Sequence, residues 1–189
     1  MRVVNRIGAP GMALMLYLLA GQVAGQSTPA ERQAKGDENL VRVVHHQILM
    51  LPYYSVFDNV MFTVDGSKVT LSGQVVRPTL KEQAEAAVKS IDGVVIVVDT
   101  IEVLPKSTVD DELRRGVYRA IFEDDVLKQY AVQAVPPIHI IVKNGAVALE
   151  GAVNNEVDKG LAEKKASTVA GVQSVANHLV VHNQETAAK

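Results

Sequence analysis

The chain contains one sequence unit twice. Residues 60–103 align with residues 138–181 without a gap, at a fixed offset of 78, and 12 of the 44 paired positions are identical. Several of the remaining pairs keep an apolar residue in both copies, as Val60 and Ile138 do. A repeat of this length constrains the fold strongly, because each copy must form one unit with a small core of its own. We therefore expect two similar lobes in tandem.

Both copies open with the periodicity of a helix. Apolar residues recur four positions apart, which places them on one helical face. They are Leu40, Val44 and Ile48 in the first copy, and Leu113, Val117 and Ile121 in the second. Each copy thus begins with an amphipathic helix.

The middle and end of each copy contain strand patterns. Residues that alternate between apolar and polar flank Asp65-Gly66 in the first copy and Asn144-Gly145 in the second, which predicts a β-hairpin in each. A second helical stripe and a last strand follow, the strands over residues 95–103 and 175–181. The predicted fold is α+β, with two tandem αββαβ lobes, each a three-stranded mixed sheet with two helices packed on one face. Each lobe is small, so we expect the two to contact each other.

Four glycines recur at matching places. Gly73 and Gly151 follow the second strand pattern, where we expect a Cβ to collide with the helix above. Gly93 and Gly171 stand where a helix C-terminus favours a left-handed residue. We interpret all four as fold markers.

The glycine spacing and the flanking apolar residues resemble a known family. The segment V-T-L-S-G-x-V at residues 69–75 is followed by Gly93-Val94, and residues 147–153 are followed by Gly171-Val172. This pattern, over residues 40–182, resembles the BON domain (bacterial osmotic-shock and nodulation domain). The resemblance implies an exported, non-enzymatic protein without cofactor, involved in envelope integrity or stress tolerance, phospholipid-surface binding or chaperone-like contact.

The N-terminus is typical of an export signal. Arg2 and Arg6 precede the apolar residues 12–20, and small residues lead to Gly25. The apolar stretch is shorter than the roughly 20 residues of a transmembrane helix. We expect cleavage near Gly25 and a periplasmic protein without a transmembrane segment, the alternatives being an uncleaved anchor or a buried helix. Losing two arginines and no acidic residue would change the net charge from −2 to −4.

The expected organisation has five parts. They are a signal peptide at 1–25, a flexible leader at 26–39, BON domain 1 at 40–104, BON domain 2 at 108–182 and a disordered tail at 183–189.

Composition and motifs argue against most chemistry. The chain has no cysteine, which excludes disulfides and thiolate metal sites. Its five histidines have no metal-ligand spacing, and neither phosphate-binding loops nor nucleophile motifs occur. A sequence pI of about 6.2 argues against nucleic-acid binding. We expect no catalytic residue, no metal and no cofactor.

Candidate contact residues lie where the two copies differ. Arginines on the first helix of the second copy and residues of the following connection form one predicted phospholipid-contact patch. It comprises Arg114, Arg115, Arg119, Val126, Leu127, Lys128 and Tyr130. Aromatic residues of the matching connection in the first copy form a second patch, Tyr53, Tyr54 and Phe57. Two alternatives remain open: the arginines are solvated and pair with Asp111 and Glu112, and the rings cap the small cores.

Two functions fit this sequence. The first is a protein that binds phospholipid headgroups at the envelope. The second is a periplasmic interaction or chaperone-like module whose partners are envelope proteins, which unpaired sheet edges would favour.

Overall fold

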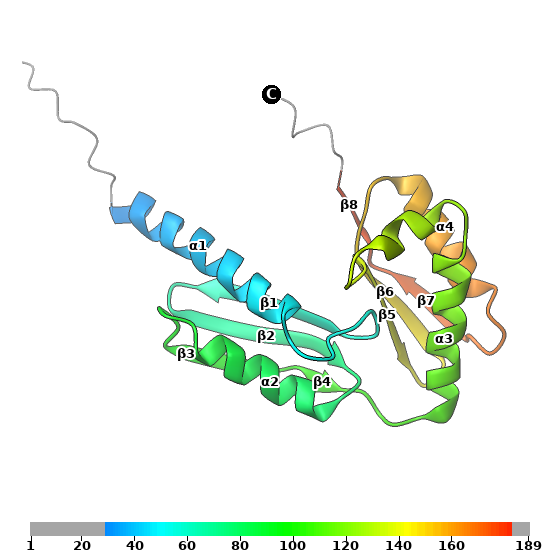
Figure 1. The fold of residues 1–189 in the computed structure, drawn as a ribbon, viewed down its shortest axis with the longest axis horizontal. Coiled ribbons are helices and arrows are strands. Elements are labelled where there is room, and N and C mark those ends of the chain that lie inside the picture. The colour runs from blue at the N-terminus through cyan, green and yellow to red at the C-terminus, as the bar shows by residue number, and fades with distance from the viewer. Residues whose placement is uncertain (1–28, 183–189) are drawn as a thin grey trace, which may run out of the picture.

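Two lobes of the same αββαβ design follow each other along the chain in the computed structural model, which describes residues 29–182 (Figure 1). The elements of lobe one are α1 (Pro29–Leu49), β1 (Asn59–Asp65), β2 (Lys68–Val75), α2 (Pro78–Lys89), β3 (Ile96–Asp99) and β4 (Glu102–Val103). Those of lobe two are α3 (Thr108–Phe122), the 3-10 helix η1 (Leu127–Val132), β5 (Ile138–Lys143), β6 (Ala146–Val153), α4 (Glu156–Ser167), β7 (Ser174–Asn177) and β8 (Val180–Val181). The predicted α+β tandem fold is confirmed.

Each sheet is mixed. In lobe one, β2 pairs antiparallel with β1 and parallel with β3 and β4. In lobe two, β6 pairs antiparallel with β5 and parallel with β7 and β8. The predicted last strand is broken in both lobes, because a side chain binds the backbone at the break. Asp99 Oδ1 accepts a hydrogen bond from the Ile101 amide at 2.8 Å, and Asn177 Oδ1 accepts one from Leu179 at 3.3 Å. Ile101 and Leu179 are buried in the cores.

The helices and the inner face of the sheet enclose one core in each lobe. In lobe one, Leu40, Val44 and Ile48 of α1 meet Leu71 of β2 and Leu80 of α2. The predicted helical stripe of α1 therefore does face the core. Lobe two repeats this packing with Leu113, Val117 and Ile121 of α3.

Helix α1 is longer than predicted. It begins at Pro29, within residues 26–39, which we expected to form a flexible leader. Residues 30–34 are strong helix formers, and proline is favourable at the first position of a helix. Periodicity alone did not predict this part of α1, because its sequence contains no apolar stripe. The predicted signal peptide at 1–25 and tail at 183–189 lie outside the described residues.

The recurrent glycines require a correction. A Cβ on Gly73 would lie 2.0 Å from the Asn59 carbonyl oxygen, and one on Gly151 would lie 2.0 Å from that of Pro137. The close neighbour is thus the adjacent backbone and not the helix, and both glycines lie within their strands at φ near +105°. Gly93 also has a positive φ, but α2 ends earlier and is capped by Ser90.

The hairpin turns differ between the lobes. Asn144 and Gly145 both have positive φ, as the prediction requires. In lobe one the closing pair is Asp65 and Lys68, so the turn residues are Gly66 and Ser67, one position later than predicted.

The lobes contact each other through the connection between α1 and β1. Val56 belongs to the core of lobe two, and its carbonyl oxygen accepts a hydrogen bond from the Ile140 amide at 2.7 Å. Glu102 of lobe one also pairs with Lys143 of lobe two at 2.5 Å. The predicted contact between the lobes is confirmed.

Candidate functional site

Helix α3 carries the candidate site on its outer side. It begins after Ser107, whose hydroxyl accepts a hydrogen bond from the Asp110 amide at 3.1 Å. Arg115, Tyr118 and Arg119 are spaced by three and four positions, so they share one face, and all three are exposed. Within residues 36–182, no carboxylate lies within ion-pairing distance of Arg115 or Arg119.

An aromatic cluster lies beside these arginines. The Tyr118 ring packs edge-on against Phe57, with 6.1 Å between ring centroids, and lies tilted against Phe122 at 4.9 Å. Phe57, Arg115, Tyr118 and Arg119 line a pocket of about 410 Å³. We call these four residues the α3 face. It combines an apolar surface with two guanidinium groups, and it joins both lobes because Phe57 comes from the connection after α1.

Arg114 does not belong to this face, although the sequence placed it with its neighbours. Its side chain is only 3% exposed. It donates to Asp111 Oδ1 at 2.5 Å and to the Val142 carbonyl oxygen at 2.7 Å, on the edge of β5. Successive helical residues point about 100° apart, so Arg114 faces the sheet while Arg115 faces outward. Arg114 fastens α3 to β5 and is not available to a headgroup.

Two of the predicted contact residues in the connection after α3 are buried. Leu127 and Tyr130 lie in the core of lobe two, so their prediction as contact residues is wrong. The Tyr130 hydroxyl donates to Asp158 at 2.5 Å and accepts from the Asn154 amide at 2.8 Å. Burial, and next the hydrogen bond to Asp158, raise the pKa of Tyr130 to about 12. Tyr130 therefore anchors the connection to α4.

The other two predicted contact residues of this connection are exposed. Val126 is exposed, and so is Lys128, whose ammonium group pairs with Asp125 at 2.7 Å. This ion pair raises the pKa of Lys128, and Asp125 neutralises the positive charge of the ammonium group.

The second predicted patch is divided in the structure. Tyr53 is exposed at φ +67°, with the Arg77 guanidinium 4.9 Å above its ring. Tyr54 lies against lobe two, 5.8 Å from the His139 ring, and burial raises the pKa of Tyr54 to about 12. Phe57 belongs to the α3 face. The alternative in which these rings cover core openings thus describes Tyr54 better than an exposed patch does.

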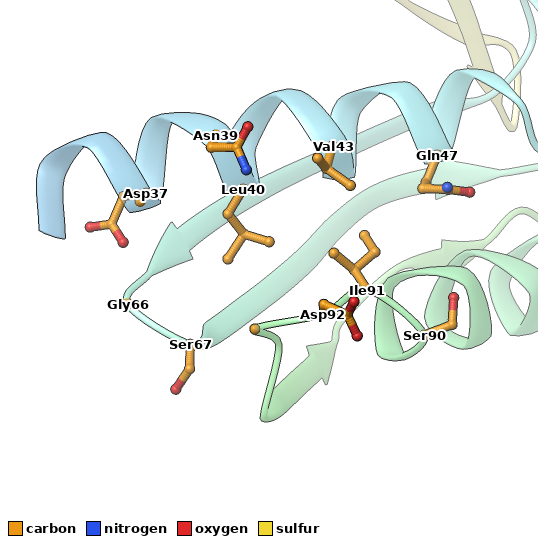
Figure 2. Close-up of a pocket in the computed structure, with 12 residues that line it drawn as sticks. Asp37, Asn39, Leu40, Val43, Gln47, Gly66, Ser67, Ser90, Ile91 and Asp92 are labelled. Atoms are coloured by element: carbon orange, nitrogen blue, oxygen red, sulfur yellow. The ribbon is translucent and has the colours of Figure 1, made fainter. Parts of the chain in front are cut away.

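Lobe one contains a second hollow, of about 500 Å³, between α1, the β1–β2 turn and the turn after α2. Figure 2 shows Leu40 and Val43 of α1 facing Ile91 across it. Asp37 and Asp92 are the charged residues of its lining.

The same region is closed in lobe two. When Leu113 is aligned with Leu40, Asp110 takes the position of Asp37, and it is buried and accepts hydrogen bonds at 2.9 Å from the turn amides of Asn144 and Gly145. Gly116 takes the position of Val43, and a Cβ there would lie 2.9 Å from Val169. The missing side chain lets α3 approach closely, whereas Val43 holds α1 away and leaves the hollow.

The sequence offered one signal that we missed. Tyr118 and Arg119 lie three and four residues after Arg115, and these are the spacings that place side chains on one helical face. The described residues contain no cluster of three or more metal-ligating side chains. None of the helices described is long and apolar enough to cross a membrane.

Comparison with known proteins identifies one family. The BON domain matches the chain twice, over residues 36–105 and 110–183. No curated protein matches the chain. Among solved structures, one of CdsD, a structural protein of the type III secretion system of Chlamydia trachomatis, has 12% identity and a TM-score of 0.32, and covers 78% of this chain and 94% of its own. A structure of the C-terminal domain of CdsD has 14% identity and a TM-score of 0.28, and the match covers 76% of this chain and 98% of that domain.

Proposed function

Because the chain belongs to the BON domain family, a family of non-catalytic domains, we propose that it is an exported envelope protein that binds anionic phospholipid surfaces through the α3 face. In this role it supports envelope integrity or stress tolerance from the periplasm. The predicted signal peptide and the family membership both favour that location.

The α3 face is the observation that carries the proposal. Two guanidinium groups that have no ion-pair partner among residues 36–182 flank an aromatic surface. Tyrosine suits the boundary between headgroups and acyl chains, because its ring is apolar and its hydroxyl remains hydrated. Each arginine near an anionic surface contributes about 1 kcal/mol.

The net charge opposes this attraction. With a formal net charge of −2, the protein as a whole is repelled by an anionic surface. Binding is therefore weak and falls with added salt, because screening acts on the exposed arginines.

Co-sedimentation with vesicles tests the proposal. The protein binds phosphatidylglycerol-rich vesicles at low salt and does not bind vesicles of phosphatidylcholine alone. Arg115→Glu with Arg119→Glu weakens binding at least about tenfold, since two favourable charges become unfavourable. A matched control, Lys106→Glu with Lys164→Glu, changes the net charge equally at exposed sites away from the α3 face. Equal losses in both double variants, or no binding by the wild type, would refute the role of this face.

A second candidate function is an interaction or chaperone-like module for envelope proteins. Strand β3 favours it, because β3 is an apolar edge strand of the lobe-one sheet, with Ile96 and Val98 exposed. An open strand of this kind can accept a strand of another protein. An aggregation assay with a reduced, unfolding model protein separates the two functions. Suppression of aggregation in the absence of lipid supports this candidate, and its absence opposes it.

A further inference from the structure

Strand β3 forms an exposed, apolar edge of lobe one. The sheet order is β1-β2-β3, so one side of β3 has no neighbouring strand among the described residues 29–182 (Figure 1). Residues 94–98 are five consecutive β-branched side chains without a charge. Val95 is 77% exposed, Ile96 52% and Val98 36%. Sheet edges of this kind pair readily with other strands, and proteins that avoid pairing place charged residues on them.

The equivalent edge of lobe two lacks this character. At the offset of 78, Val97 corresponds to Val175, and both pack against their own cores. The outward-facing residues Ile96 and Val98 correspond to Ser174 and Ala176. The domain fold therefore requires the inward valine but not the outward apolar pair. That pair is a property of lobe one alone.

Backbone hydrogen bonds define which groups of β3 are free. The Ser67 carbonyl oxygen accepts hydrogen bonds from the Val95 amide at 2.8 Å and from the Ile96 amide at 3.2 Å, so the Val95 amide is not free. The Thr100 amide donates to the Leu71 carbonyl oxygen at 2.9 Å. In a parallel ladder, alternate residues face the neighbouring strand. Even-numbered residues of β3 thus face β2, and Val97 and Asp99 direct their N–H and C=O groups to the open side.

We propose that β3 pairs antiparallel with β3 of a second copy of this chain, around a two-fold axis at Val97. This register places Ile96 opposite Val98 of the other copy on the outer face, as two apolar cross-strand pairs. Val97 exchanges both backbone hydrogen bonds with its symmetry mate. Asp99 meets Val95, so the two carboxylates do not face each other.

The same register makes one continuous sheet. Residues opposite each other in an antiparallel pair point to the same face, so the lobe-one helices of both copies stay on one face of the joined sheet. No other protein is needed, since the apolar run is complementary to itself in this register. The paired strands are four residues long, and the interface is therefore smaller than the roughly 800 Å² per partner of a stable dimer. The dimer is accordingly weak and depends on concentration.

Sedimentation equilibrium of the full chain tests the pairing. The weight-average mass of the wild type rises with concentration towards that of a dimer. Ile96→Lys with Val98→Lys lowers the association constant at least about tenfold, because lysines on an edge oppose pairing. Ser174→Lys with Ala176→Lys, the matched change in lobe two, leaves it unchanged. A wild type that remains monomeric, or equal effects of both variants, would overturn the proposal.

A cross-link tests the register independently. The chain has no cysteine, so Val97→Cys introduces a single thiol. Residues of a hydrogen-bonded antiparallel pair lie about 5.5 Å apart at Cα, which a disulfide can span. Mild oxidation yields a covalent dimer of Val97→Cys but not of Val175→Cys. The absence of cross-linking in Val97→Cys, or equal cross-linking in both variants, refutes the two-fold axis at Val97.

Discussion

Two adjacent arginines on α3 should respond in opposite ways to one substitution. Arg114→Ala removes a buried guanidinium that fastens the helix to β5, whereas Arg115→Ala removes an exposed one from the α3 face. We predict that Arg114→Ala destabilises the fold and preserves lipid binding. Arg115→Ala should preserve the fold and weaken lipid binding.

The magnitude follows from the contacts of Arg114. Its loss leaves the buried Val142 carbonyl without its partner, which costs about 2 kcal/mol. The two buried methylene groups that the substitution removes from its stem, Cγ and Cδ, contribute about 1.6 kcal/mol more. Loss of the ion pair with Asp111 adds little to this destabilisation, because the Asp111 side chain is 48% exposed and is hydrated once Arg114 is removed. A loss of about 4 kcal/mol lowers the melting temperature of a chain of this size by about 8–16 °C.

Thermal unfolding followed by circular dichroism measures this difference. Arg115→Ala melts close to the wild type, since an exposed substitution changes stability by about 0.5 kcal/mol or less. Its vesicle affinity falls about fivefold, the equivalent of about 1 kcal/mol. An Arg114→Ala variant that melts with the wild type and loses lipid binding would refute the assignment of the two arginines.

Three further substitutions test the fold. Gly151→Ala should destabilise lobe two by about 2–4 kcal/mol in urea unfolding, because its Cβ would collide with the Pro137 carbonyl oxygen at a strained φ. Gly160→Ala should instead stabilise lobe two by about 0.5–1 kcal/mol, because Gly160 lies within α4 and has open space around it. Tyr130 has a pKa of about 12 in the folded state against 10.0 as the reference, so its contribution to stability is complete below pH 10 and is lost as the pH rises towards 12. Urea unfolding of Tyr130→Phe should show that its free energy of unfolding falls less than that of the wild type over that pH window. An equal fall in both proteins would contradict the role given to the Tyr130 hydroxyl.

The fold was largely predictable because its elements have different periods. The change from a helical spacing at Leu40 and Val44 to alternation around Asp65-Gly66 indicates where helix gives way to hairpin. The duplication then applied the same order to both lobes. The start of α1 was not predictable from periodicity, since residues 29–39 favour a helix through intrinsic propensity and contain no apolar stripe in their sequence.

The candidate site was less predictable, for a physical reason. Leu127 and Tyr130 lie in a long connection without periodicity, so the sequence does not distinguish a residue that covers the core from one that contacts a partner. Phe57 joins the α3 face only through packing between lobes, which no local pattern encodes. The opposite orientations of Arg114 and Arg115 were predictable, because Arg114 lies three residues before the buried Val117.

The contact between the α3 face and lipid can be measured directly. In amide NMR spectra with phosphatidylglycerol nanodiscs that carry a spin-labelled lipid, paramagnetic broadening reports which residues approach the bilayer. The account predicts that broadening is strongest at Phe57, Arg115, Tyr118 and Arg119. Broadening centred on β3 or spread evenly over both lobes, or none at low salt, would contradict it.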